Sequence, residues 1–204
     1  MPLRSIATFL FMLMFAGAAQ ASTILVWGDS LSAGYGLKPG EAWPTLLQTR
    51  LKDEGFRHTV VNASVSGETS AGGRSRLPAA LEQHKPSIVI LELGANDGLR
   101  GLRPQLMAEN LTAMIDAARA AGSQVLLVGM QMPPNYGVTY TRRFAETFTE
   151  VAQAHKVPLV PFLLDGFAHQ PELFLADGIH PTAEAQPRVL DTVWQGLKPL
   201  LGRK

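Results

Sequence analysis

Five short runs of apolar and β-branched residues recur along the chain, at residues 23–27, 59–63, 87–93, 124–129 and 157–162. The apolar residues in each run are nearly continuous rather than alternating, which predicts strands buried on both faces. The runs start about 28 to 37 residues apart, which is the size of a strand–helix unit. This order predicts one parallel sheet with helices on both faces.

One-sided apolar stripes between the runs predict the helices, because residues three and four apart share one helix face. The stripes are Trp43-Leu46-Leu47-Leu51, Leu106-Leu111-Met114-Ile115, Phe144-Phe148-Val151 and Val189-Val193-Leu197-Leu200. Proline and glycine fall between these elements, and no linker, low-complexity tract or sequence repeat is visible. The sequence therefore predicts a single α/β domain.

Composition excludes several classes of protein. The 204 residues are 46% hydrophobic, which is ordinary for a globular chain and argues against wholesale disorder. A formal net charge of +1 argues against a nucleic-acid binder, which usually carries a basic excess. The absence of cysteine excludes disulfides, thiolate catalysis, iron–sulfur clusters and cysteine zinc sites.

The first 21 residues have the composition of an export signal. Arg4 precedes an apolar run at residues 6–15, and Ala19-Gln20-Ala21 forms a small-x-small cleavage site. The run is about ten residues long, short of the roughly 20 that a membrane-spanning helix needs. We expect residues 1–21 to be a cleaved signal peptide and residues 22–204 to be an exported domain. The alternative is an uncleaved anchor that tethers the domain to the membrane.

Candidate functional residues follow the first three runs, and ligands of open parallel sheets bind at the carboxyl ends of strands. Ser30 follows the first run, Gly67 the second and Asn96 the third. A serine at a strand-to-helix turn can expose its hydroxyl, and a glycine N–H or an asparagine amide can donate to an oxyanion. Each residue also fits a structural role, Ser30 as a helix cap and the other two in turns.

A fourth polar segment, Asp177-Gly178-Ile179-His180, lies near the C-terminus. An aspartate three residues before a histidine can accept the imidazole Nδ1–H and leave Nε2 to take a proton from a serine. The structural alternative is a helix cap beside a surface histidine. A metal site is not expected, because no second histidine or carboxylate stands at ligand spacing and no HExxH motif occurs.

Taken together, these segments supply a nucleophile, a base with its orienting carboxylate, and oxyanion donors. No Gly-x-Ser-x-Gly motif occurs, which argues against an ordinary α/β-hydrolase elbow. The segments Gly28-Asp29-Ser30-Leu31, Gly67, Gly94-Ala95-Asn96-Asp97 and Asp177-Gly178-Ile179-His180-Pro181 resemble the four blocks of the SGNH (GDSL) hydrolases. The longer stretches at residues 62–73, 94–101 and 134–137 resemble the bacterial thioesterase I, lysophospholipase L1 and arylesterase branch.

The resemblance covers residues 23–200 and implies a role for each matching residue. Ser30 would attack the acyl carbonyl, His180 would carry the proton and Asp177 would orient His180. The N–H groups of Ser30 and Gly67 and the side-chain amide of Asn96 would form the oxyanion hole. The branch implies acyl thioesters and oxyesters as substrates, including aryl esters and lysophospholipids, and it implies no cofactor.

Residues next to these blocks are candidates for binding the acyl chain. They are Leu99, Arg100, Leu102, Met132, Pro134 and Tyr136. Leucine, methionine and tyrosine near the site can line a groove for an apolar chain, although methionines at a strand end can equally belong to the core. An arginine at position 100 can meet an anionic head group or simply remain solvated.

We therefore expect a flavodoxin-like three-layer α/β/α sandwich that hydrolyses carboxylic esters and thioesters. The protein is expected in the periplasm, with secretion as the alternative, and as a monomer without nucleic-acid partners. Two other functions stay open at this point. One is a carbohydrate-ester deacetylase of the same family, and the other is a non-catalytic binding module on the same fold.

Overall fold

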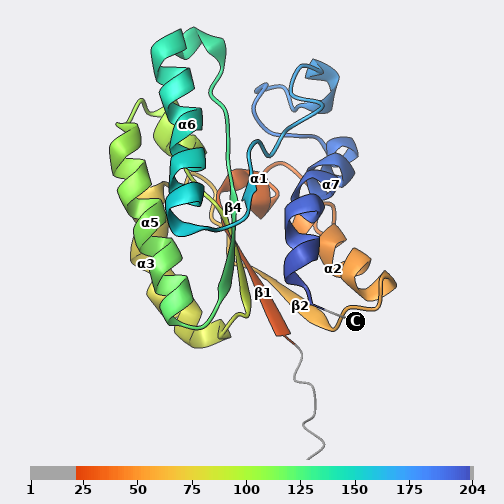
Figure 1. Ribbon diagram of the computed structural model, residues 1–204. Helices are drawn as coiled ribbons and strands as arrows, with labels where there is room; N and C mark the ends of the chain where they lie inside the picture. Colours follow the sequence, from red (N-terminus) through yellow and green to blue (C-terminus); the bar gives the residue numbers. More distant parts are fainter. Residues whose placement is uncertain (1–21, 203–204) are drawn as a thin grey trace, which may run out of the picture.

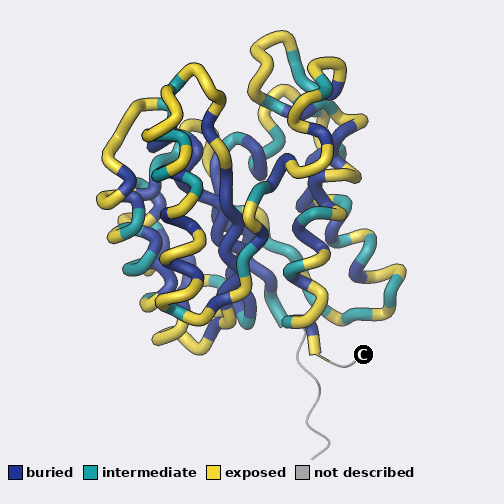
Figure 2. The backbone as a smooth tube through the Cα atoms, turned by 45° about the horizontal axis from the view of Figure 1, so that its top comes forward, coloured by how far each residue is buried: buried dark blue, intermediate teal, exposed yellow. Residues whose placement is uncertain are grey.

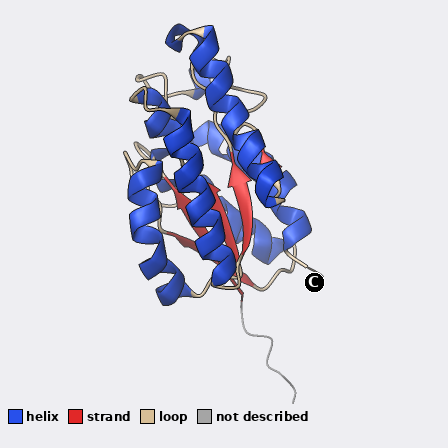
Figure 3. Cartoon of the chain, turned by 60° about the vertical axis from the view of Figure 1, so that its left-hand side comes forward, coloured by secondary structure: helices blue, strands red, loops and turns tan. Residues whose placement is uncertain are grey.

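A computed structural model describes residues 22–202, which form a parallel sheet between two layers of helices (Figures 1 and 3). The strands are β1 (Ser22–Gly28), β2 (His58–Asn62), β3 (Ile88–Glu92), β4 (Gln124–Val128) and β5 (Leu159–Val160). Their order across the sheet is β2-β1-β3-β4-β5, and every neighbouring pair is parallel. This is the flavodoxin-like order, so the predicted fold class is confirmed.

Helices cover the two faces of the sheet unequally. One layer consists of α3 (Ser70–His84), α5 (Pro104–Ala120) and α6 (Val138–His155), and the other of α2 (Trp43–Asp53) and α7 (Gln186–Leu197) (Figure 1). Two short helices, α1 (Ser30–Ala33) and α4 (Ala95–Leu99), directly follow β1 and β3. Single 3-10 turns lie at Pro134–Tyr136, Pro171–Leu173, Ala183–Ala185 and Lys198–Leu200.

The core lies where the helices meet the central strands. Every residue of β3 is buried, as are Ile24, Leu25 and Val26 of β1. In Figure 2 the segments at the centre of the molecule are dark blue, the colour of buried residues. Four large aromatic side chains, Trp27, Trp43, Phe144 and Phe148, are almost completely buried. Burial of this kind contributes roughly 1.5–3 kcal/mol for each large apolar side chain. A rigid sheet therefore supports the loops at its carboxyl edge.

Two strands differ from the sequence prediction. β2 is not buried on both faces, because it pairs only with β1 at the edge of the sheet and its side chains are partly exposed. β5 is two residues long, whereas the sequence predicts a strand over residues 157–162. Pro158 and Pro161 flank it, and proline has no N–H to donate to a strand ladder.

Two helices also differ from what the apolar stripes in the sequence predict. α3 begins at Ser70, and its buried face combines the small residues Ser70, Gly73 and Ala80 with Leu77 and Leu81, so it offers few large apolar residues. A Cβ at Gly73 would lie 2.2 Å from Leu93 Cδ1, so glycine allows this close approach. In α5 the stripe residue Leu106 is 41% exposed, and Met107 is buried in its place.

The expected signal peptide at residues 1–21, and the boundary it sets, lie outside the described residues. None of the helices within residues 22–202 is both long enough and apolar enough to cross a lipid bilayer.

Candidate active site

Ser30, His180 and Asp177 meet at the carboxyl edge of the sheet, although 150 positions separate the first two. Ser30 is the first residue of α1, directly after β1, and the other two lie in the loop that leads to α7. His180 Nε2 is 2.8 Å from Ser30 Oγ, and His180 Nδ1 is 2.7 Å from Asp177 Oδ2. This arrangement allows a proton to pass from the hydroxyl to the imidazole.

Asp177 is held by its own loop. Its Oδ1 accepts the backbone N–H groups of Ile179 and His180, at 2.9 and 3.0 Å, while Oδ2 faces the imidazole. These hydrogen bonds, led by the one from Ile179, lower the pKa of the Asp177 carboxyl to about 2. The side chain therefore stays ionised at every pH at which the protein is expected to work. A fixed carboxylate holds a proton on Nδ1 and leaves Nε2 as the base.

The ring of Tyr35 packs against the imidazole of His180. Its ring centroid is 4.4 Å from that of His180, with the two planes tilted by 36°. Tyr35 is itself 53% exposed, so it covers His180 from the solvent side. The ring limits the orientations that the imidazole can adopt.

The Gly28–Ser32 turn that carries Ser30 is fixed by Asp29. Asp29 Oδ1 accepts Leu31 N–H at 3.0 Å and caps α1, while Oδ2 accepts the side-chain amide of Asn96 at 3.1 Å. Asp29 is 1% exposed, and this burial raises its pKa to about 6. The aspartate of the Gly-Asp-Ser motif therefore connects the nucleophile to the loop after β3.

The loops after β2 and β3 lie next to this turn. Val65 N–H donates to Gly28 O at 3.0 Å, and Asn96 Nδ2 donates to Glu68 O at 3.0 Å. Gly67, between Val65 and Glu68, has a φ of +78°, which favours glycine. Asn96 Nδ2 thus faces two acceptors, Asp29 and Glu68, so an incoming oxyanion competes with one of them for an amide hydrogen.

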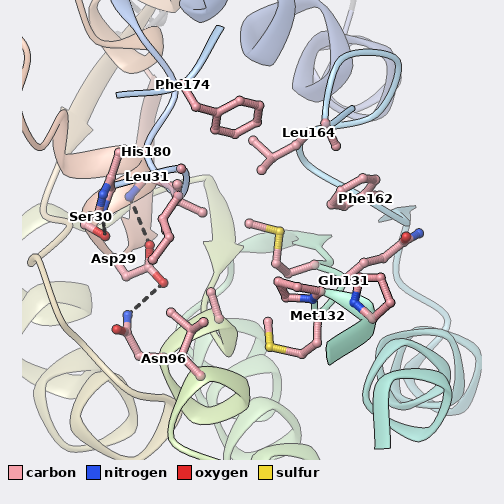
Figure 4. Close-up of a pocket in the computed structure, with 18 residues that line it drawn as sticks. Asp29, Ser30, Leu31, Asn96, Gln131, Met132, Phe162, Leu164, Phe174 and His180 are labelled. Atoms are coloured by element: carbon pink, nitrogen blue, oxygen red, sulfur yellow. Dashed lines mark hydrogen bonds between the residues drawn. The ribbon is translucent and has the colours of Figure 1, made fainter. Parts of the chain in front are cut away.

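A cavity of about 470 Å³ opens beside Ser30 and His180. In Figure 4, Ser30 and His180 lie at one end of this pocket, and Gln131 and Phe162 lie at the other. Most of the wall is apolar, with lining residues that include Leu31, Met130, Leu164, Ala168, Phe174 and Ile179. A cavity of this shape suits an extended apolar group whose reacting end lies at Ser30.

The structure divides the six residues proposed for substrate binding into two sets. Leu99, Met132 and Pro134 line the cavity. Arg100, Leu102 and Tyr136 are not among its lining residues. Arg100 donates from its guanidinium to Gly67 O at 3.0 Å, Leu102 is 39% exposed, and Tyr136 donates to Leu99 O at 3.2 Å. The side chains of Arg100 and Tyr136 therefore bind neighbouring loops rather than line the cavity, and that of Leu102 is partly exposed to solvent.

Residues 26–187 match the sequence profile of the GDSL-like lipase/acylhydrolase family. The chain belongs to this family. The match includes every segment that forms the Ser30, Gly67, Asn96 and His180 constellation, so the resemblance seen in the sequence is confirmed.

Three related proteins support the assignment to this family. An esterase TesA of Pseudomonas aeruginosa is 51% identical over 192 residues, which cover 94% of this chain and 96% of the relative. A thioesterase 1/protease 1/lysophospholipase L1 of Escherichia coli is 42% identical over 193 residues, covering 95% and 91%. A crystal structure of the psychrotrophic esterase EstA of Pseudoalteromonas, inhibited by monoethylphosphonate, superposes with a TM-score of 0.84 at 41% identity, covering 89% of this chain and 100% of the other. This chain is therefore a serine hydrolase of acyl esters and thioesters.

Part of the pocket was missed by the sequence analysis. Phe162, Leu164 and Phe174 line the cavity, and none of them was proposed from the sequence as a binding residue. Phe162 ends the fifth apolar run and Leu164 lies two residues beyond it, so the rule that ligands bind at strand ends, applied to that run, would have found them. Phe174 and Tyr35 carry no such signal, because only the tertiary fold brings them to the site.

Residues that could hold a metal ion do not gather at this site. Within residues 22–202, no three His, Asp or Glu side chains lie close enough together to share an ion. The polar groups of the site are a hydroxyl, an imidazole, an amide and carboxylates, which together suit nucleophilic acyl transfer.

Proposed function

We propose that this hydrolase acts through an acyl-enzyme intermediate on Ser30, with acyl chains as the group transferred. The observation that carries the proposal is the hydrogen-bonded series from Ser30 through His180 to Asp177, located at one end of an apolar cavity. The series supplies a nucleophile and its base, and the cavity supplies a place for an apolar acyl chain.

In the acylation step, Ser30 Oγ attacks the acyl carbonyl while His180 Nε2 takes the hydroxyl proton. The developing oxyanion receives hydrogen bonds from the Ser30 and Gly67 N–H groups and from the Asn96 amide. One donor of this kind is typically worth about 3–4 kcal/mol of transition-state stabilisation. His180 then gives its proton to the departing alcohol or thiol, and the acyl group remains as an ester on Ser30.

In the deacylation step, a water molecule takes the place of the leaving group. His180 Nε2 removes a proton from the water as it attacks the ester carbonyl of Ser30. Collapse of the second oxyanion breaks the bond to Ser30 Oγ, which recovers its proton from His180 and releases the carboxylic acid. Asp177 keeps the imidazole in the same tautomer throughout both steps.

The apolar cavity supports acyl chains longer than acetyl. Leu31, Leu164 and Phe174 line its wall, so methylenes placed there leave water. Each buried methylene contributes about 0.8 kcal/mol, which corresponds to roughly a fourfold rise in kcat/KM for each added carbon while the chain fits. Acyl thioesters and lysophospholipids present such a chain, in line with the name of the Escherichia coli relative, and aryl esters present one where their acyl group is long.

The proposed location is the periplasm, and the support for it is the composition of residues 1–21. Arg4, the short apolar run and the Ala19-Gln20-Ala21 sequence are typical of a cleaved export signal. The proposed partner is a small-molecule ester or thioester, met by a monomeric enzyme that has no nucleic-acid partner.

A substrate panel tests the proposal. The purified protein and its Ser30→Ala variant are assayed on p-nitrophenyl esters, acyl-coenzyme A thioesters and lysophospholipids of graded chain length. The expected result is activity that rises with chain length beyond acetate and disappears in Ser30→Ala. Activity confined to acetate would indicate the deacetylase alternative, and no activity on any member of the panel would indicate a binding module.

A further inference from the structure

A buried glutamate lies beneath the turn that carries the nucleophile. Glu92 is the last residue of β3, in register with Gly28 of β1, and it is 3% exposed. It belongs to none of the sequence blocks that point to hydrolysis, and it does not line the substrate cavity. A buried carboxyl group in the centre of a sheet requires a compensating role, because removing it from water is costly.

The Glu92 carboxyl holds the turn by direct contacts. Its Oε2 accepts the Ser32 hydroxyl at 2.6 Å and the Asp29 N–H at 3.4 Å. Asp29 and Ser32 lie on either side of Ser30 along the chain, and Ser32 is fully buried. Since both contacts converge on one oxygen, the carboxyl fixes the backbone that positions Ser30 Oγ and the Ser30 N–H.

The space under the turn is built for this carboxyl. A Cβ at Gly28 would lie 2.5 Å from Glu92 Oε2, so glycine at this position leaves room for the carboxyl group. From the β2 side, Asn62 Nδ2 donates to Ser32 O at 2.8 Å. The turn is therefore held from both neighbouring strands of β1, and Glu92 supplies the contact from β3.

The charges around Glu92 disfavour its ionised form. No salt bridge in the described part of the chain includes Glu92 or Asp29. The titratable group that faces Glu92 is Asp29, which itself feels His180 and Asp97. Burial, followed by the charge of Asp29, raises the pKa of Glu92 well above its usual value. If Glu92 were ionised, its charge and that of Asp29 would repel each other, and no salt bridge among the described residues would offset the repulsion.

We propose that Glu92 is a positioning residue for hydrolysis, a neutral carboxylic acid that holds the Gly28–Ser32 turn so that Ser30 and its N–H keep their reactive geometry. The proposal rests on the assignment of Ser30 as the nucleophile. It predicts that Gln can replace Glu92, because a carboxamide oxygen accepts the same two hydrogen bonds without charge. It also predicts that loss of these contacts lowers kcat and leaves KM unchanged, because neither Glu92 nor Ser32 lines the cavity.

The experiment compares four variants on a p-nitrophenyl ester. Glu92→Ala removes the carboxyl, Glu92→Gln restores the acceptor, and Ser32→Ala removes the donor from the other side. Ser123→Ala is the matched control, since Ser123 is buried and donates to Pro86 O at 2.6 Å next to the start of β4, at the opposite edge of the sheet. Circular dichroism and thermal melting show which variants fold.

The proposal gives a distinct result for each variant. Glu92→Ala should lose roughly 10- to 100-fold in kcat with an unchanged KM, as expected for a misplaced nucleophile. Glu92→Gln should restore kcat to within about threefold of the parent, and Ser32→Ala should lose about fivefold, the effect of one hydrogen bond. Ser123→Ala should lower the melting temperature with no change in kcat. The rate of fluorophosphonate labelling should follow kcat in each variant.

Three results would overturn the proposal. The first is a Glu92→Gln variant as slow as Glu92→Ala, which would mean that the negative charge is needed. The second is parental kcat in Ser32→Ala, which decides the question even if Glu92→Ala fails to fold. The third is an equal loss of kcat in Ser123→Ala, which would mean that general destabilisation is the cause. A parent protein that fluorophosphonate does not label would instead overturn the Ser30 assignment itself.

Discussion

Replacing Asp177 with asparagine tests the proposed proton transfer most sharply, because the change removes a charge and keeps the shape. In the parent, Oδ1 accepts two backbone N–H groups, from Ile179 and His180, and Oδ2 accepts His180 Nδ1–H. The backbone donors require an oxygen, so the asparagine carbonyl takes the Oδ1 position and its NH₂ faces His180 Nδ1. Two donors then oppose each other, and the imidazole adopts the other tautomer.

The change of tautomer at His180 sets the size of the expected loss in kcat. With the proton on Nε2, His180 cannot accept the hydroxyl proton of Ser30 across the 2.8 Å contact. In serine hydrolases of this design the same exchange lowers kcat by about 10⁴-fold. At about 1.36 kcal/mol for each tenfold change, the loss is about 5.4 kcal/mol of transition-state stabilisation. The fold should change little, because both backbone hydrogen bonds remain.

The assay measures kcat and KM on a p-nitrophenyl ester, with a melting curve for each protein. Asp191→Asn is the matched control, since Asp191 is an exposed aspartate on α7 that pairs with Arg50 of α2, away from the cavity. Asp177→Asn should lose about 10⁴-fold in kcat, and Asp191→Asn should keep the parental rate. If Asp177→Asn keeps more than about one hundredth of the parental kcat, another group orients His180 and the reasoning is refuted.

Three further predictions concern the nucleophile, the core and the titration of Asp177. Ser30→Ala should abolish turnover without lowering the melting temperature, and esterase activity in the purified variant would contradict the assignment. Phe144→Ala should lower the free energy of unfolding by about 3–5 kcal/mol in urea denaturation, because Phe144 is 1% exposed and a cavity would remain. The low pKa of Asp177 stabilises the fold above pH about 4, and this contribution disappears as the pH falls through about 2. Carbon NMR of the Asp177 carboxyl should therefore show a midpoint at about 2, and a midpoint near 4 would contradict this.

The strands were predictable from the sequence where they are central. β1, β3 and β4 contain continuous apolar residues because helices cover both of their faces. The run that forms β2 was interpreted in the same way, yet its place at the edge depends on the pairing order, which a single strand does not encode. α3 was not among the predicted stripes, because much of its buried face consists of small residues such as Gly73, which packs directly against Leu93. Small residues on a helix face give a weak apolar signal in the sequence.

The residues of the site were predictable where several weak motifs could be combined. Ser30, Asp177 and His180 come from segments that each also fit an ordinary structural role, such as a helix cap or a surface residue. The parallel sheet brings them together. For Arg100 the sequence left open a substrate head group or solvent, and in the structure its guanidinium donates to Gly67 O. The sequence does not show which way a long side chain turns. Hydrogen bonding within the fold decided its direction.

The support beneath the site was invisible in the sequence. Glu92 lies inside the third apolar run without any motif, and its contacts with Ser32 and Asp29 exist only once β1 and β3 pair in register. The same holds for the pocket wall of Leu164 and Phe174, which the loops after β5 bring to the cavity. Tertiary pairing creates both features, and neither has a local pattern of its own.

Mass spectrometry of the protein after reaction with a fluorophosphonate tests the central claim most directly. The reagent bonds to a serine only where a neighbouring base activates the hydroxyl. We predict one adduct per chain, located by peptide mapping at position 30, and no adduct when His180 is replaced by alanine. An adduct on any other serine, or none on the folded protein, would contradict the account.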